Sequence, residues 1–214
     1  MALQLYLHPL SSYSHKALMA FYENDIAFEP RRVDDPAVYE ELKGIWPLAR
    51  FPFLRDSARD HVVPEATIII EYLAQHYPGK VKLIPDDPDL ARQVRMRDRF
   101  FDNYLHAPVQ KFAFDHVRPA DKRDAYGVEE ARTMYFKALD MVETSIGNKT
   151  WAMGDDFTMA DCAAAPPLFY GNRFFGPFTD THKNAAAYLE RLMARPSYAR
   201  ALEEAKPFFH YLPA

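Results

Sequence analysis

Serine side chains gather near the start of the chain, in the stretch "LHPLSSYSHKALMAFYEN" that runs from residue 7 to residue 24. Ser11, Ser12 and Ser14 stand at the beginning of an apolar pattern with helical spacing. Serine hydroxyls at a helix start accept hydrogen bonds from free backbone N–H groups, for about 1 kcal/mol, or donate hydrogen bonds to a bound anion. The turn therefore predicts a helix cap, a donor site for a reactive group, or both.

Other reactive sites have weak support in the sequence. His15 lies beside the serines, but one histidine is insufficient to argue for an acid–histidine–serine arrangement. Cys162 stands in an alanine-rich run, where a free cysteine is more often an inert core residue than a nucleophile. The eight histidines are dispersed and no HExxH or CxxC motif occurs, so we expect no metal. No glycine-rich phosphate-binding loop occurs either.

Charge and composition exclude two classes of partner. The net charge is −4 and the basic residues are scattered, so we expect neither nucleic acid nor an anionic membrane as a partner. Apolar runs such as "TIIIEYLA" are too short to span a bilayer, and no export signal is visible. A lone cysteine makes no internal disulfide, which fits a cytoplasmic protein.

The elements that must position the serine turn alternate in type over the first third of the chain. The segments "LQLYL", "IAFEPRRV", "FPFL" and "HVV" have strand patterns, and helical patterns begin at Ser14, Pro36 and Glu65. Strands that alternate with helices pair in parallel, whereas the closely spaced last two form an antiparallel hairpin. Residues 1–79 are therefore predicted to be an α/β domain with a mixed four-stranded sheet.

Residues 88–214 are predicted to form a second domain that is all α-helical. Pro108 should kink the first of its helices, because the ring and the missing N–H disrupt the preceding turn. The amphipathic patterns predict five helices, at Asp89–His116, Val128–Ile146, Met159–Phe169, Asn184–Arg195 and Tyr198–Ala205.

Four motifs in this order resemble those of the soluble glutathione transferases: "SSYSHKAL", "WPLARFPFL" from residue 46 to 54, "PEATIIIEYL" from 64 to 73 and "FTMADCAAAP" from 157 to 166. The resemblance covers nearly the whole chain. It implies a thioredoxin-like N-terminal domain that binds glutathione, an all-helical domain that completes a site for a small apolar electrophile, and a homodimer.

The resemblance also implies which residues hold glutathione. Pro52 matches a cis proline, and the backbone of Phe51 before it would pair with the cysteinyl backbone of glutathione. The start of the helix at Glu65 and Ala66 would bind the γ-glutamyl group. Ala66 replaces the usual serine or threonine, a loss of about 1.5–3 kcal/mol of hydrogen bonding that Thr67 is placed to offset.

The implied chemistry is attack by the glutathione thiolate on an electrophilic carbon. A thiol of ordinary pKa near 8.5 is only about 3% ionised at pH 7, so the site must lower that pKa. By resemblance Ser11 is the first candidate to donate a hydrogen bond to the sulfur. Ser12 is the second candidate, Tyr6 the third and Tyr13 the fourth, whereas Ser14 is the more structural residue of the turn.

By the same resemblance, three residues on the first helix of the second domain are candidates for the electrophile site: Tyr104, Pro108 and Phe112. Thr158 and Asp161 form a capping box with a structural role.

Two alternatives to a transferase remain open. One is a glutathione-dependent isomerase or dehalogenase, and the other is a non-catalytic module that uses the fold for binding or assembly.

Overall fold

A four-stranded sheet forms the frame of the N-terminal half in the computed structural model, which describes residues 2–213. Its strands are β1 (Leu3–Leu7), β2 (Glu29–Arg32), β3 (Phe53–Asp56) and β4 (His61–Pro64). They lie in the order β2-β1-β3-β4; β1 and β2 are parallel, and the other two pairs are antiparallel. The predicted mixed sheet with a final hairpin is confirmed.

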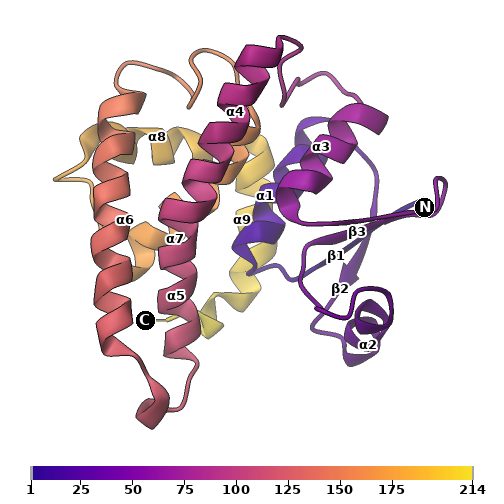
Figure 1. Cartoon of the computed structure of the whole chain (residues 1–214), viewed down its shortest axis with the longest axis horizontal. Helices are drawn as coiled ribbons and strands as arrows, with labels where there is room; N and C mark the ends of the chain where they lie inside the picture. The colour runs from indigo at the N-terminus through magenta and orange to yellow at the C-terminus, as the bar shows by residue number, and fades with distance from the viewer. Residues whose placement is uncertain (1, 214) are drawn as a thin grey trace.

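Helices pack on both faces of this sheet (Figure 1). Helix α1 (Ser12–Glu23) and helix α3 (Ala66–His76) share one core with Leu3, Leu5 and Leu7 of β1. Tyr6 points to the opposite face, because side chains alternate along a strand. There it packs with residues of α2 (Pro36–Ile45) in a second, smaller core.

The rest of the chain is helical, as predicted, and packs against the open side of α1 (Figure 1). Helices α7 and α9 both contact α1, so the two domains share a helix-lined interface. The elements are α4 (Pro88–Phe100), a π-helical segment (Phe101–His106), α5 (Ala107–His116), a 3₁₀ turn (Ala120–Lys122), α6 (Ala125–Ile146), α7 (Met159–Phe174), α8 (Lys183–Ala194), α9 (Pro196–Ala205) and a 3₁₀ segment (Lys206–Tyr211). The predicted domains begin at residue 1 and end at residue 214, and these two terminal residues lie outside the described ones.

The helix predicted over residues 89–116 contains an irregularity just before Pro108. The chain passes from α4 through the π-helical segment Phe101–His106 into α5 without leaving the helical conformation. Because Pro108 has no N–H to donate to the preceding turn, a change of hydrogen-bond pattern is expected there. The predicted disruption therefore takes the form of a local π-helical turn.

Helix α7 is longer than the sequence pattern indicated. It ends at Phe174 rather than at Phe169, and it passes through Pro166 and Pro167. All of the residues from Met159 to Leu168 are buried, so packing on several sides holds the segment helical in spite of the prolines.

The start of α7 has the predicted capping box. The backbone N–H of Thr158 donates to Asp161 Oδ2 at 2.8 Å, and the Thr158 hydroxyl donates to the same oxygen at 3.2 Å. Asp161 Oδ1 accepts from the backbone N–H of Ala152 and from the hydroxyl of Tyr188. Cys162 is fully buried, and burial raises the pKa of its thiol, which fits an inert core residue.

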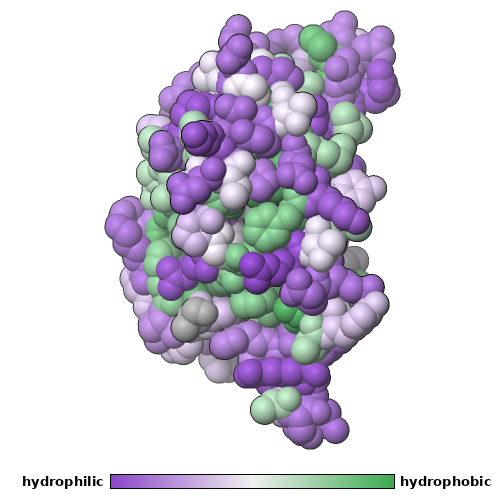
Figure 2. Space-filling model, turned by 90° about the vertical axis from the view of Figure 1, so that its left-hand side faces the viewer, coloured by the Kyte–Doolittle hydropathy of each residue, from purple (hydrophilic) through white to green (hydrophobic). Residues whose placement is uncertain are grey.

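The outer face of the helical half is mostly hydrophilic, with a smaller hydrophobic area near its centre (Figure 2). Within residues 2–213, no helix combines the length and the apolar character that crossing a membrane requires.

Candidate active site

A cleft of about 830 Å³ lies between the two domains, at the N-terminal end of α1. One wall comes from the start of α1, the loop before β3 and the start of α3; the other comes from α5. Seven of the residues predicted from the sequence line this one cleft: Ser11, Ser12, Tyr13, Phe51, Pro52, Glu65 and Ala66. The fold thus brings together three segments that are far apart along the chain.

The loop before β3 presents a free backbone edge to the cleft. The peptide bond between Phe51 and Pro52 is cis, as predicted. The β1–β3 pairing stops at Phe53, opposite Tyr6. Among the described residues, the N–H and C=O of Phe51 have no backbone partner, so both groups are available to pair with an extended peptide.

The start of α3 offers a second set of free groups. Glu65 is exposed and has a φ of 73°, and its side chain does not cap the helix. The first backbone N–H groups of the helix, from Ala66 onward, are therefore open to a ligand. Such a helix end favours a carboxylate or phosphate because the N–H groups and the helix dipole both attract negative charge.

The serine turn divides into one capping residue and two neighbours with different surroundings. Ser11 is the N-cap of α1, and its Oγ accepts a hydrogen bond from the N–H of Ser14 at 3.2 Å. This leaves the Ser11 hydroxyl proton free to donate into the cleft. The Ser12 hydroxyl lies against a ring nitrogen of His106. Ser14 is fully buried and does not line the cleft, in keeping with its predicted structural role.

The structure does not bring Tyr6 to this cleft. Its side chain is fully buried on the α2 face of the sheet, and its hydroxyl donates to Glu41 at 2.6 Å. Burial and that hydrogen bond raise the pKa of Tyr6 to about 12. Tyr13, in contrast, lines the cleft, and its ring stacks on that of His106 with centroids 3.8 Å apart.

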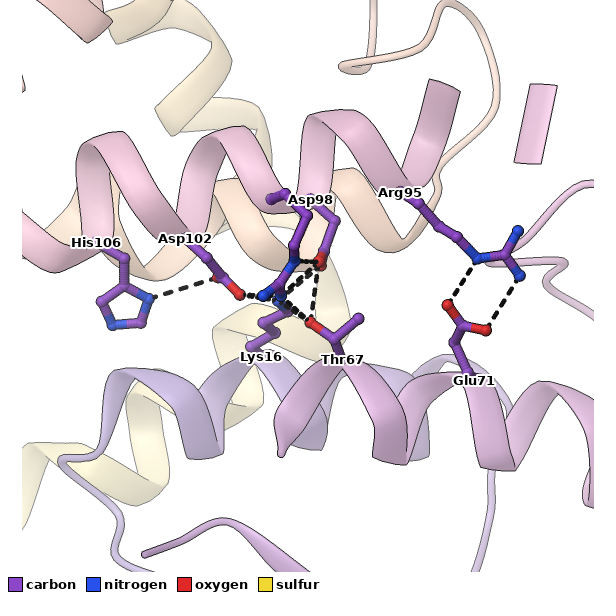
Figure 3. Close-up of polar contacts among 8 residues, drawn as sticks. Lys16, Thr67, Glu71, Arg95, Asp98, Asp102 and His106 are labelled. Carbon is purple, nitrogen blue, oxygen red and sulfur yellow. Dashed lines mark hydrogen bonds and ion pairs between the residues drawn. The ribbon is translucent and has the colours of Figure 1, made fainter. Parts of the chain in front are cut away.

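A buried ionic cluster joins α1 and α3 to the helical half of the chain (Figure 3). Lys16 Nζ on α1 lies 2.6 Å from Asp98 Oδ1 and 2.8 Å from Asp102 Oδ2, and it also bonds the Thr67 hydroxyl at 2.8 Å. The Thr67 hydroxyl in turn donates to Asp98. Lys16 and Asp98 are completely buried, so the cluster fixes α1 and α3 against α4.

This cluster corrects the prediction for Thr67. The Thr67 hydroxyl accepts a hydrogen bond from Lys16 and donates one to Asp98, so it serves the domain interface and not the ligand. It does not replace the donor that is absent at Ala66. The backbone N–H of Thr67 remains part of the open helix start.

The helical wall of the cleft differs from the one predicted. Gln110, Ala113 and Phe114 line it, one helical stripe of α5. Of the three candidates named from the sequence, Tyr104 is exposed outside the cleft, Pro108 is buried, and Phe112 stacks on Phe174 of α7. None of the three is among the residues that line the cleft, so the resemblance selected the wrong side chains of this helix.

The comparisons with known proteins agree with this arrangement. Residues 5–81 match the family model "Glutathione S-transferase, N-terminal domain", and residues 105–196 match "Glutathione S-transferase, C-terminal domain". A stringent starvation protein A homolog of Coxiella burnetii is 29% identical over 165 residues, 77% of this chain and 74% of that protein. A probable maleylacetoacetate isomerase of Caenorhabditis elegans is 28% identical over 176 residues, 79% of each chain.

A solved structure extends the similarity to three dimensions. A glutathione S-transferase from Methylobacterium radiotolerans, in complex with glutathione sulfonate, matches with a TM-score of 0.79 and 27% identity over 93% of each chain. The two family models agree with the observed sheet and with the helical second half. The chain therefore belongs to the glutathione S-transferase family.

Proposed function

We propose that this protein binds glutathione in the interdomain cleft and ionises its thiol, and that the thiolate attacks an electrophilic carbon of a small apolar compound to give a thioether. The observation that carries the proposal is the meeting of three complementary groups in one cleft. These groups are the free backbone edge of Phe51, the open start of α3, and the serine turn at the N-terminus of α1.

Each group fits one part of glutathione. The γ-glutamyl carboxylate suits the free N–H groups at Ala66, and Glu65 provides a carboxylate for the ammonium group. The cysteinyl backbone fits the unpaired N–H and C=O of Phe51. The thiol then lies at the serine turn, where the Ser11 hydroxyl donates to the sulfur and the N-terminus of α1 stabilises its negative charge.

The other substrate is an apolar electrophile that enters along α5. Ala113 and Phe114 give this wall its apolar character, beside the polar Gln110.

We also keep two expectations from the sequence, a homodimer and a cytoplasmic location. Sedimentation or light scattering measures the first, and cell fractionation the second.

The test combines glutathione binding by calorimetry, ultraviolet titration of the bound thiol, and conjugation of a chloro-nitroaromatic. Ser11→Ala should raise the pKa of the bound thiol by about one to two units, the equivalent of one lost hydrogen bond to a charged group. Ser11→Thr should restore it, because threonine keeps both the cap and the hydroxyl.

Ser14→Ala is the matched control, since Ser14 belongs to the same turn but is buried outside the cleft. Its thiol pKa should equal that of the wild type. A wild-type protein that does not bind glutathione would favour the non-catalytic module. Binding with an ionised thiol but no conjugation would favour an isomerase or dehalogenase, and an unchanged thiol pKa in Ser11→Ala would remove Ser11 from this role.

A further inference from the structure

The hydrogen bond between Ser12 and His106 links the cleft to a buried imidazole. Ser12 Oγ, in the first turn of α1, lies 2.5 Å from His106 Nε2, in the last position of the π-helical segment. Ser12 lines the cleft, whereas the exposed fraction of His106 is 0%. The bond therefore leads from the place where a ligand sulfur would lie to a titratable group that solvent does not reach.

The other side of the ring determines where its proton sits. His106 Nδ1 faces Asp102 Oδ1 at 3.9 Å, the ion-pair contact drawn in Figure 3. Among the described residues, neither atom has a partner at hydrogen-bond distance. A carboxylate favours a proton on the ring nitrogen that faces it, so we assign the proton of the neutral ring to Nδ1. Nε2 then offers its lone pair and accepts the proton of the Ser12 hydroxyl. Stacking against Tyr13 holds the ring in this orientation.

Burial keeps His106 neutral, while the carboxylate of Asp102 stabilises its protonated form. Burial lowers the pKa of His106 below its ordinary value. The charged groups that act on it, among the described residues, are Asp102 from its own segment and Lys16 from α1. His15 from α1 is a second titratable group that interacts with it. The pKa of Asp102 is lowered in spite of burial, because His106 and Lys16 stabilise its anion. A proton taken up at Nε2 thus leaves an imidazolium whose Nδ1–H faces a carboxylate.

We propose that His106 is the base that receives the thiol proton of bound glutathione, through the hydroxyl of Ser12. The thiol proton moves to Ser12 Oγ while the hydroxyl proton of Ser12 moves to His106 Nε2. One S–H bond breaks and one N–H bond forms, Ser12 ends as it began, and the products are a thiolate and an imidazolium paired with Asp102. This inference rests on the proposed function and gives Ser12 a different task from Ser11, which donates to the thiolate once it has formed.

The relay makes a prediction that a purely structural Ser12–His106 contact does not. When glutathione binds and ionises, the proton stays in the protein on His106 instead of entering the buffer. Ultraviolet absorbance counts the thiolate that forms, and calorimetry in two buffers of different ionisation enthalpy counts the protons released. The wild type should form thiolate with release of much less than one proton per sulfur.

Breaking the relay at either end should change both counts. Ser12→Ala and His106→Gln should each lower the thiolate fraction near neutral pH by about tenfold, which corresponds to one unit of thiol pKa. Whatever thiolate remains should form with release of a full proton. The double variant should be no worse than either single one, because both remove the same path. Ser12→Ala is the variant with the smaller folding risk, since its side chain lies at the cleft surface.

His15→Gln is the matched control for the loss of a buried histidine. His15 is also completely buried, but its Nε2 lies 2.6 Å from the carbonyl oxygen of Pro9 and not beside a serine hydroxyl. This variant should keep the wild-type thiolate fraction and proton count. A full proton released by the wild type, or unchanged counts in Ser12→Ala, would overturn the relay even if conjugation proceeds. Failure of the wild type to bind glutathione would instead overturn the proposed function, and the relay with it.

Discussion

The hydroxyl of Tyr6 is held in the protonated form by its surroundings, and this makes its contribution to stability depend on pH. The folded-state pKa is about 12, above the value near 10 of an exposed tyrosine. A raised folded-state pKa means that the contribution is complete below pH 10 or so, and is lost as the pH rises toward about 12. We therefore expect the wild type to keep its full stability advantage over Tyr6→Phe at about pH 9 and to lose it by about pH 12.

Urea unfolding of both proteins at the two pH values measures this difference, and the other buried tyrosines cancel because both proteins contain them. A stability difference that stays constant across the range would contradict the prediction. Because Tyr6 lies on the α2 face of the sheet, glutathione affinity of folded Tyr6→Phe should equal that of the wild type. If folded Tyr6→Phe lost glutathione affinity without a change in stability, Tyr6 would again be a candidate for the glutathione site.

Local signals in the sequence indicated Ser11, Ser12, Phe51 and Glu65, because caps, turns and prolines act over a few residues. His106 was not predicted. It lies 94 residues from Ser12, and a single sequence contains no information on which distant side chains meet. The available hint was weak: Asp102 and His106 stand four residues apart, a spacing that places two side chains on one helix face.

At the scale of elements, the capping box at the start of α7 is a structural device that can be separated from the glutathione site. Thr158 and Asp161 are buried, and their hydrogen bonds satisfy groups at the helix start. Thr158→Ala should lower the free energy of unfolding by about 0.5–2 kcal/mol. Denaturant unfolding measures the loss, and calorimetry should find the glutathione affinity of the folded variant unchanged.

Thr144→Ala is a suitable control for that experiment. Thr144 lies exposed on α6, and its hydroxyl donates to the carbonyl of Asp140 within the same helix. Its removal should have little effect on stability, since surface substitutions of this kind stay within about 0.5 kcal/mol. A Thr158→Ala protein that unfolds like the wild type but has lost affinity would show that the box serves the site.

Elements with a long, regular pattern were predictable, and the irregular ones were not. Apolar periodicity predicts both the alternation of strands and helices before residue 79 and the helices after residue 88. The π-helical segment at Phe101–His106 breaks that periodicity, and no local pattern indicates it. The side chains that line the cleft depend on how the two domains pack, so the resemblance selected Tyr104 and Phe112 where Ala113 and Phe114 form the wall. The extension of α7 to Phe174 depends on burial from several directions, which a local pattern does not contain.

At the scale of the whole molecule, the two domains are joined by charges in the interior rather than by apolar packing alone. Lys16 of α1 contacts Asp98 and Asp102 from the helical half, and the three side chains are almost completely inaccessible to solvent.

The chain also offers one natural fluorescence reporter in each domain, because its two tryptophans are Trp46 and Trp151. Single-tryptophan proteins made with Trp46→Phe or Trp151→Phe therefore report the unfolding of each domain separately.

Lys16→Met should weaken this junction more than any exposed pair. Methionine keeps the length of the side chain but removes the charge, which leaves Asp98 buried beside fewer donors. Removing one partner of a buried pair costs about 3–5 kcal/mol. We expect the wild type to show one midpoint for both tryptophans, and Lys16→Met to show a lower midpoint at Trp46 than at Trp151.

Arg95→Gln supplies the matched control, because Arg95 of α4 pairs with Glu71 of α3 across the same junction (Figure 3). That pair is partly exposed, with 44% of the arginine side chain accessible, so its loss should cost only about 0.2–1 kcal/mol. Burial is thus the variable that differs between the two variants. Coincident midpoints in Lys16→Met, with a loss no larger than that of Arg95→Gln, would mean that apolar packing of α1 against α7 and α9 joins the domains without help from the buried charges.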